Sequence, residues 1–149
     1  MKTPILKLIF IGLMTAPAAW AAPGAVKPPT VQVYKDPACG CCTAWIKHLQ
    51  ANGFQVVAHD TNDVAAHKQR LGVPFGVGSC HTAEVGGYVV EGHVPAQDIR
   101  RLLSERPRVR GLVVPGMPMG SPGMEGERKD AFDVLLIDRD GSTRQYARY

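Results

Sequence analysis

Long apolar runs are nearly absent from this chain of 149 residues. The run Leu8–Met14 is one of the few, and it is far shorter than the roughly 20 residues that a helix needs to cross a bilayer. No later segment is long enough either. We therefore expect no membrane insertion of the mature protein.

Signatures of common enzymes and of nucleic-acid-binding proteins are also missing. The chain has no G-x-S-x-G, no Walker phosphate loop, no H-E-x-x-H and no paired catalytic carboxylates. Aromatic residues make up only 7% of the chain and do not alternate with basic residues in a stripe. This composition excludes nucleic acid as an expected partner. Attention therefore turns to the cysteines, histidines and methionines.

The first 21 residues are typical of a secretory signal. Lys2 and Lys7 give a positive start, an apolar run follows, and Ala19-Trp20-Ala21 forms a small-x-small cleavage site. The next residue, Ala22, is not the cysteine of a lipoprotein. We expect export to the periplasm as a soluble protein after cleavage; an uncleaved membrane anchor is the alternative.

Cleavage would leave 149 − 21 = 128 residues, which suits one domain. The signal carries two of the 17 Lys and Arg residues, so the mature charge is 15 − 13 = +2. The expected division is a signal peptide over 1–21, a flexible Pro/Gly-rich leader over 22–30 and one domain over 31–149. Four cysteines in an oxidising compartment must be in disulfides, redox-active or bound to metal.

Local signals predict an alternation of strands and helices in the first part of the domain. A strand over Val31–Tyr34 precedes a helix that carries Trp45, Ile46 and Leu49 on one stripe and ends at Asn52-Gly53. A second strand covers 54–59. The second helix is expected to begin with a cap at Thr61, to end before Gly72 and to turn three apolar residues inward: Val64, Ala65 and Leu71.

A hairpin and a third helix come next. Gly86-Gly87 predicts a two-residue hairpin turn. Pro95 suits the first turn of a helix, which Pro107 should end. The apolar residues expected on the buried face of this helix are Ile99, Leu102 and Leu103. A crossover followed by a hairpin predicts an α/β fold with a mixed central sheet and flanking helices.

The segment 106–130 differs from the rest in its many prolines, glycines and methionines. Only "GLVV" within it resembles a strand. Loops this long in a compact domain are usually functional or disordered. After it, a C-terminal hairpin is expected to turn at Asp140-Gly141.

Three of the four cysteines lie within four positions, in "DPACGCC". Cys39 and Cys42 form a C-x-x-C that follows a strand and opens a helix, a context typical of redox-active pairs. The helix N-terminus favours thiolate over thiol. We therefore expect Cys39 and Cys42 to be the reactive pair, and thus the candidate catalytic residues.

Cys41 has no role in a simple disulfide exchange. A third thiolate at one helix end is repelled by the other two unless a cation neutralises them, and thiolates favour soft metals such as Cu(I). Cys80 could complete a site of four thiolates, and His81 beside it could also bind copper or zinc. In the alternatives, Cys41 is a small buried residue or pairs with Cys80, and His81 is a polar surface group.

The three methionines of the mature chain lie close together in the Pro/Gly-rich segment: Met117, Met119 and Met124. Thioethers bind Cu(I), whereas zinc sites use cysteine, histidine and carboxylate. The methionines thus favour copper over zinc as the metal. Alternatively, they hold the loop against an apolar face.

The remaining histidines give weaker signals. His48 is expected to be solvated, His59 ends a strand, and His67 is expected on the outer face of the second helix. His93, in "GHVP", could approach the cysteines if the loops converge.

The motifs "DPACGCC", "SCHTAEV", "VEGHVPA" and "VPGMPMGSPGME" resemble a CopG-type family of predicted periplasmic metal-binding proteins that occurs with bacterial copper-resistance systems. The likeness covers about residues 31–146. It implies a thioredoxin-like fold, copper bound by the clustered cysteines and a role in copper tolerance. Carried over by position, the motif cysteines are Cys39, Cys41, Cys42 and Cys80.

The resulting hypothesis is an exported Cu(I)-thiolate protein with a cluster of copper ions. It could couple a change between Cu(I) and Cu(II) to the thiols, which would make it a copper oxidoreductase. Copper chaperones or efflux components would be its protein partners. The alternatives are a thiol-disulfide oxidoreductase that uses Cys39 and Cys42, a non-enzymatic metal buffer, and a disulfide-stapled binding domain.

Overall fold

The computed structural model describes residues 28–149. The expected signal peptide and most of the leader lie outside the described residues. The elements in chain order are β1 (Val31–Lys35), α1 (Gly40–Ala51), β2 (Val56–Asp60), α2 (Val64–Leu71), β3 (His81–Val85), β4 (Tyr88–Glu91), α3 (Ala96–Glu105), β5 (Gly111–Val113), β6 (Asp133–Ile137) and β7 (Thr143–Arg148). Among these residues, no helix has the length and apolar character to cross a membrane.

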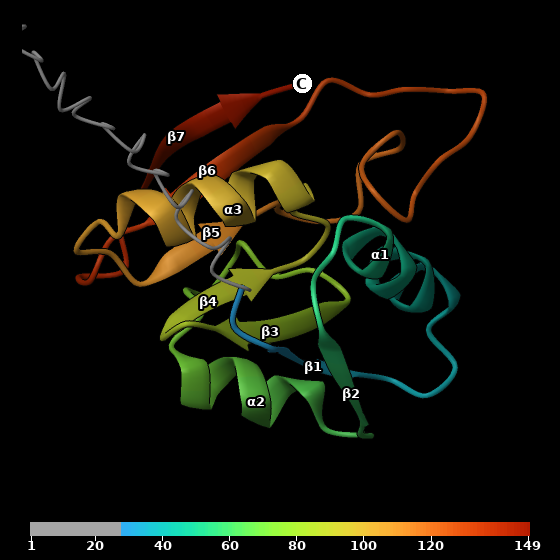
Figure 1. Cartoon of the computed structure of the whole chain (residues 1–149), viewed down its shortest axis with the longest axis horizontal. Coiled ribbons are helices and arrows are strands. Elements are labelled where there is room, and N and C mark those ends of the chain that lie inside the picture. The colour runs from blue at the N-terminus through green and yellow to red at the C-terminus, as the bar shows by residue number, and fades with distance from the viewer. Residues whose placement is uncertain (1–27) are drawn as a thin grey trace, which may run out of the picture.

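All seven strands form one mixed sheet with the order β2-β1-β3-β4-β5-β6-β7 (Figure 1). β1 pairs with β2 and β4 with β5 in parallel, and the other neighbours are antiparallel. The predicted α/β class with a mixed central sheet is confirmed. The succession from β1 to α3 is compatible with the thioredoxin-like arrangement that the resemblance implies. The predicted C-terminal hairpin, β6 and β7, extends this same sheet through β5.

Helices α1 and α3 supply the main core on one face of the sheet. The predicted stripe of α1 is buried, and Trp45 and Leu49 are fully buried within it. Ile99 and Leu102 of α3 join them, whereas Leu103 is only partly buried. On β1, Val31 and Val33 face this core, and Tyr34, the next residue, faces α2 on the opposite side of the sheet.

Helix α2 differs from its expected form. Asp63, not Thr61, caps it: the Asp63 carboxylate accepts from the Ala66 N–H at 2.9 Å, while Thr61 accepts from the Asp63 N–H at 3.1 Å. None of the eight residues of α2 is fully buried. Of the three residues expected to point inward, Val64 and Leu71 are partly buried and Ala65 is exposed.

The chain turns where glycine and proline predict it. Gly86 and Gly87 have φ of 56° and 86°, as a two-residue hairpin requires. Gly72 ends α2 in the left-handed conformation, with φ of 71°. Pro95 precedes the first residue of α3, and Arg106 ends this helix with φ of 48°, before Pro107.

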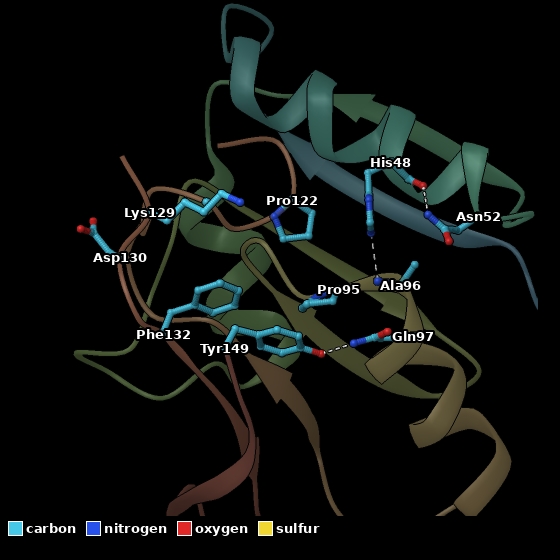
Figure 2. A pocket seen from close by; sticks show the side chains of 11 residues that line it. His48, Asn52, Pro95, Ala96, Gln97, Pro122, Lys129, Asp130, Phe132 and Tyr149 are labelled. Carbon is cyan, nitrogen blue, oxygen red and sulfur yellow. Dashed lines mark hydrogen bonds between the residues drawn. The ribbon is translucent and has the colours of Figure 1, made fainter. Parts of the chain in front are cut away.

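His48 joins α1 to the start of α3. Its Nε2 accepts from the Ala96 N–H at 3.1 Å (Figure 2), so the expectation of a solvated side chain is wrong. An acceptor nitrogen must be neutral, and burial lowers the pKa of His48. The ring borders a cavity of about 350 Å³ whose wall includes Pro122 and the stacked rings of Phe132 and Tyr149, 5.0 Å apart.

Candidate metal centre

The first turn of α1 begins at a cysteine. Cys39 is the N-cap, and its sulfur accepts from the Cys42 N–H at 3.3 Å. Asp36 prepares the turn, because its carbonyl accepts from the Cys39 N–H and its carboxylate from the Ala38 N–H. Cys39 and Cys42 are joined in a disulfide with Cα atoms 5.4 Å apart. The C-x-x-C thus lies at the strand-to-helix turn where sequence places it, and its redox activity stays a prediction.

The other two of the chain's four cysteines are free thiols beside this disulfide. The Cys41 sulfur lies 3.5 Å from that of Cys39 and 3.7 Å from that of Cys80. The Cys80 sulfur lies 3.4 Å from that of Cys42. All four sulfurs lie within 4.8 Å of one another. A disulfide between Cys41 and Cys80, one of the alternatives, is not formed.

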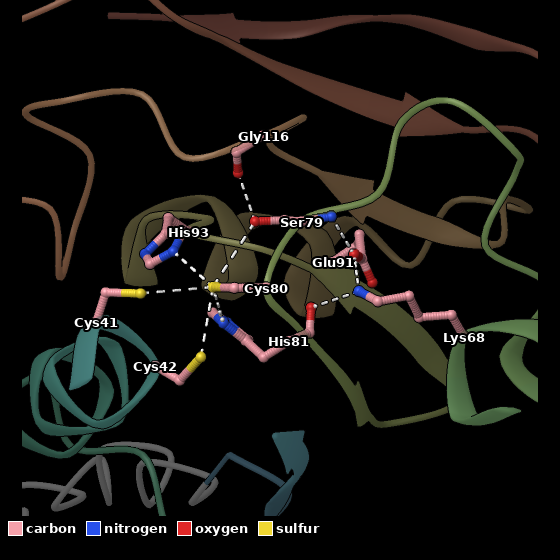
Figure 3. Close-up of polar contacts among 9 residues, drawn as sticks. All are labelled: Cys41, Cys42, Lys68, Ser79, Cys80, His81, Glu91, His93 and Gly116. Carbon is pink, nitrogen blue, oxygen red and sulfur yellow. Dashed lines mark hydrogen bonds and ion pairs between the residues drawn. The ribbon is translucent and has the colours of Figure 1, made fainter. Parts of the chain in front are cut away.

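Two histidines complete the surroundings of Cys80 (Figure 3). Nδ1 of His81 lies 3.3 Å from the Cys80 sulfur, and Nε2 of His93 lies 3.1 Å from it. Both rings belong to buried residues. Cys80, His81 and His93 form a second group whose ligand atoms lie within 4.8 Å of one another. Cys80 therefore belongs to both the four-sulfur group and the sulfur-imidazole group.

Neighbouring groups fix the orientation of the two rings. Nδ1 of His93 lies 2.8 Å from the Pro122 carbonyl oxygen. Since a carbonyl only accepts, Nδ1 carries the proton and Nε2 turns a lone pair toward Cys80. The His81 ring packs on the Trp45 indole at 4.3 Å, and the indole N–H donates to the Val94 carbonyl at 2.9 Å.

Burial favours the neutral forms of His81, His93 and Cys80. It lowers the pKa of His81 well below the usual value, with a further contribution from the positive charge that His93 and Lys68 can carry. It also lowers the pKa of His93. Burial and the adjacent Cys41 raise the pKa of the Cys80 thiol to about 12. Around neutral pH the site thus offers neutral imidazoles and a Cys80 thiol that must lose its proton before it binds a metal.

The Pro/Gly/Met-rich segment covers the site. Gly123 lies directly on the first turns of α1: a Cβ there would lie 2.7 Å from the Cys41 carbonyl oxygen and from the Trp45 nitrogen. Met117 is about half exposed, with 51% of its surface accessible. Met119 and Met124 are partly buried. The segment is therefore ordered against the cysteines, and copper binding by its three methionines stays a prediction.

The structure changes the roles expected for several histidines. The sequence leaves open whether His81 is a metal ligand or a polar surface group. In the structure it is fully buried against Cys80. His93, a weaker candidate, is the imidazole nearest to the Cys80 sulfur. The sequence signal for this position was the hairpin at Gly86-Gly87, whose register brings His93 opposite Cys80. His67 was expected on an outer face, but it stacks on Tyr34 at 4.1 Å. His59 is exposed and bonded to Gln32.

Comparison with known proteins gives two solved structures and one family. Both structures are titled copper resistance protein CopG, in forms 2 and 1. Each is 53% identical to this chain and covers 82% of it, which corresponds to 98% of the solved chain, with TM-scores of 0.78 and 0.77. A family described as a protein of unknown function, DUF411, matches residues 77–124. No curated protein sequence matches significantly.

Proposed function

This chain belongs to the family of copper resistance protein CopG, and we propose that it is an exported periplasmic protein of copper resistance that binds Cu(I). The observation that carries the proposal is the gathering of four cysteine sulfurs within 4.8 Å of one another. Thiolates are soft ligands that select Cu(I). The three cysteines at the N-terminal end of α1 and Cys80, just before β3, would surround the metal.

The proposed cargo is a cluster of copper ions, not one ion. Each thiolate sulfur can bridge two metals, so four sulfurs can hold more ions than separate two- or three-coordinate sites would. His81 and His93 would add nitrogen ligands, which lie 3.3 Å and 3.1 Å from the Cys80 sulfur. Met117 and its two neighbouring methionines are proposed as further Cu(I) ligands from the covering segment. Zinc would leave these thioethers without a role.

The proposed chemistry couples copper to the Cys39–Cys42 pair. When the two thiols close into a disulfide, they release two electrons and two protons. Each Cu(II) takes one electron to become Cu(I), so one closure reduces two Cu(II) ions. The described state has this disulfide closed. It leaves two thiols and two imidazoles, Cys41, Cys80, His81 and His93, as ligands for copper in the oxidised protein. A dithiol reductant would reopen the disulfide.

Two rival functions make different predictions. A thiol-disulfide oxidoreductase acting on proteins needs only Cys39 and Cys42, so its activity would survive loss of Cys41. A copper buffer would bind Cu(I) tightly without transferring electrons. In the proposed function, copper chaperones or efflux components would be the protein partners that receive Cu(I).

Substitution of Cys41 separates these functions. The mature protein and its Cys41→Ser variant would be reduced, loaded with Cu(I) without oxygen and freed of excess metal. We expect the variant to lose most of the copper that the parent retains, because the bridging sulfur is gone. Full stoichiometry in the variant would overturn the cluster. Insulin reduction that is equal in both proteins would favour the thiol-exchange function.

A further inference from the structure

A buried ion pair lies on the side of Cys80 away from α1 (Figure 3). Lys68 of α2 pairs with Glu91 at the end of β4. The Glu91 side chain is fully buried, and 20% of the Lys68 side chain is exposed. Neither residue has a place in the proposed copper chemistry. The other hydrogen bonds of Lys68 and Glu91 show which part of the chain the ion pair holds in place.

The two charges bind the backbone on both sides of Cys80. The Glu91 carboxylate accepts from the N–H of Ser79, the residue before Cys80, at 2.6 Å. The Lys68 ammonium donates to the carbonyl of His81, the residue after Cys80, at 3.3 Å. Peptide groups bonded on both sides leave Cys80 little freedom to move.

Further contacts hold the same three residues. The Gly92 N–H donates to the His81 carbonyl at 3.2 Å. Gly92 has φ of 71°, and a Cβ there would lie 2.6 Å from the Ser79 side chain, so only glycine lets β4 approach this closely. The Ser79 hydroxyl donates to the Gly116 carbonyl in the covering segment. The ion pair is thus the charged part of a clamp around Cys80.

A contribution to folding stability does not by itself explain why a buried ion pair is present here. Removing two charges from water costs free energy that their attraction often fails to recover, and apolar residues of similar volume can replace a buried pair without loss. One oxygen of Glu91 even lacks a hydrogen-bond partner among residues 28–149. What apolar residues could not supply is the pair of hydrogen bonds to Ser79 and His81.

We propose that Lys68 and Glu91 are positioning residues, which fix the Cys80 sulfur and the His81 ring where copper is to bind before the metal arrives. The proposal rests on the proposed function for the identity of the metal. Groups that orient metal ligands in this way typically change metal affinity by about 10–100-fold when they are replaced.

The test compares Lys68→Met/Glu91→Leu with Arg70→Met. The double variant removes both charges and both hydrogen bonds without leaving an unpaired charge. Arg70 lies on the same helix and pairs with Glu84 on the same sheet at 3.3 Å, so its variant is a matched control. Lys68→Arg keeps the charge and should rescue part of the effect.

The first readout is the reactivity of one thiol. In a Cys41→Ser background with the Cys39–Cys42 disulfide closed, Cys80 is the only free thiol. We expect iodoacetamide to alkylate it faster in the double variant, because Cys80 is then less restrained, and at the parental rate in Arg70→Met. Parental alkylation in a folded double variant would overturn the proposal. Should the double variant not fold, Glu91→Gln, which keeps the acceptor for Ser79, and Lys68→Met are compared separately.

The second readout is Cu(I) affinity of the reduced proteins, measured with bathocuproine disulfonate as competitor. We expect a loss of about tenfold or more in the double variant, with a thermal midpoint close to that of the parent. Unchanged Cu(I) affinity in a folded double variant would likewise contradict positioning. A parent that binds no Cu(I) would overturn the proposed function instead, and the alkylation rates would still decide the positioning.

Discussion

The sulfur of Cys80 lies 3.1 Å from Nε2 of His93, and a backbone carbonyl determines which nitrogen of that ring carries the proton. The Pro122 carbonyl belongs to the segment that covers the site, so this segment sets the tautomer of His93. The lone pair on Nε2 faces the thiol as an acceptor, and in the proposed function it would serve as a copper ligand once the thiol proton has left.

Replacement of His93 by glutamine should weaken Cu(I) binding. The amide cannot offer the imidazole nitrogen beside Cys80. Replacing a group that only orients a ligand costs about 10–100-fold in metal affinity, so the loss of a proposed ligand should cost at least as much. Competition with bathocuproine disulfonate measures the change. His59→Gln is the control, because His59 is exposed and bonded to Gln32. Equal affinities of both variants and the parent would remove His93 from the site.

Copper binding should release a proton from Cys80. Its thiol has a pKa raised to about 12 by burial and by Cys41, so it is protonated at neutral pH and must ionise to bind metal. Apparent Cu(I) affinity should therefore rise with pH, by about tenfold per unit for each proton released. Anaerobic calorimetry in buffers of different ionisation enthalpy should find about one proton fewer for Cys80→Ser. Equal proton release from both proteins would contradict this role of Cys80.

Acid should destabilise the metal-free protein in part through His48. The unfolded imidazole has a pKa of 6.5, and burial lowers the pKa of the folded one. The unfolded state thus binds more protons as the pH falls below 6.5, so the free energy of unfolding falls with pH in that window. His81 and His93 act in the same direction, since burial lowers the pKa of both.

Urea unfolding at a series of pH values from about 8 to about 5.5 tests this account across the histidine range. His48→Gln should show a smaller loss of stability on acidification than the parent, because the group that must stay neutral is gone. His59→Gln should behave like the parent. A parental slope in the His48 variant would show that its bond to Ala96 does not carry the pH dependence.

Gly123→Ala should lift the covering segment from α1. Gly123 has φ of 86°, and an added Cβ would meet backbone atoms of Cys41 and Trp45 that cannot move aside. The left-handed conformation alone should lower the free energy of unfolding by at least about 1–2 kcal/mol. Cys80 should also react faster with iodoacetamide. Gly126→Ala is the control, because its Cβ would meet only the flexible end of Met119.

Sequence predicted the elements that depend on local signals. The stripe of Trp45 and Leu49 repeats with the helical period, and Gly86-Gly87 specifies its turn without help from distant residues. The cap of α2 was misplaced because Thr61 and Asp63 are both good cap residues two positions apart, and the sequence does not favour one of them. The apolar pattern of α2 is short and weak, so its burial could not be inferred.

The sequence predicted the part of the site whose residues are close together in the chain. It missed contacts that only the tertiary structure creates. Cys39 and Cys42 lie on one turn of helix, so their pairing follows from spacing. Cys80, 38 residues beyond Cys42, was predicted as a possible fourth thiolate of the same site. His93 was not joined to Cys80, although the register of the Gly86-Gly87 hairpin, which pairs Thr82 with Glu91, brings the two residues opposite each other. The Pro122 carbonyl that orients the ring comes from after β5, and no local pattern specifies this contact.

The most direct test is the copper and free-thiol content of the mature protein, purified without oxygen, loaded with Cu(I) and freed of excess metal. A thiolate cluster predicts at least about two copper ions per chain, lost when the four cysteines are replaced by serine. Binding should also change the fluorescence of Trp45, which packs on His81 and is the only tryptophan beyond residue 21. A protein that retains no copper, yet opens and closes the Cys39–Cys42 disulfide reversibly, would contradict the account and indicate thiol exchange instead.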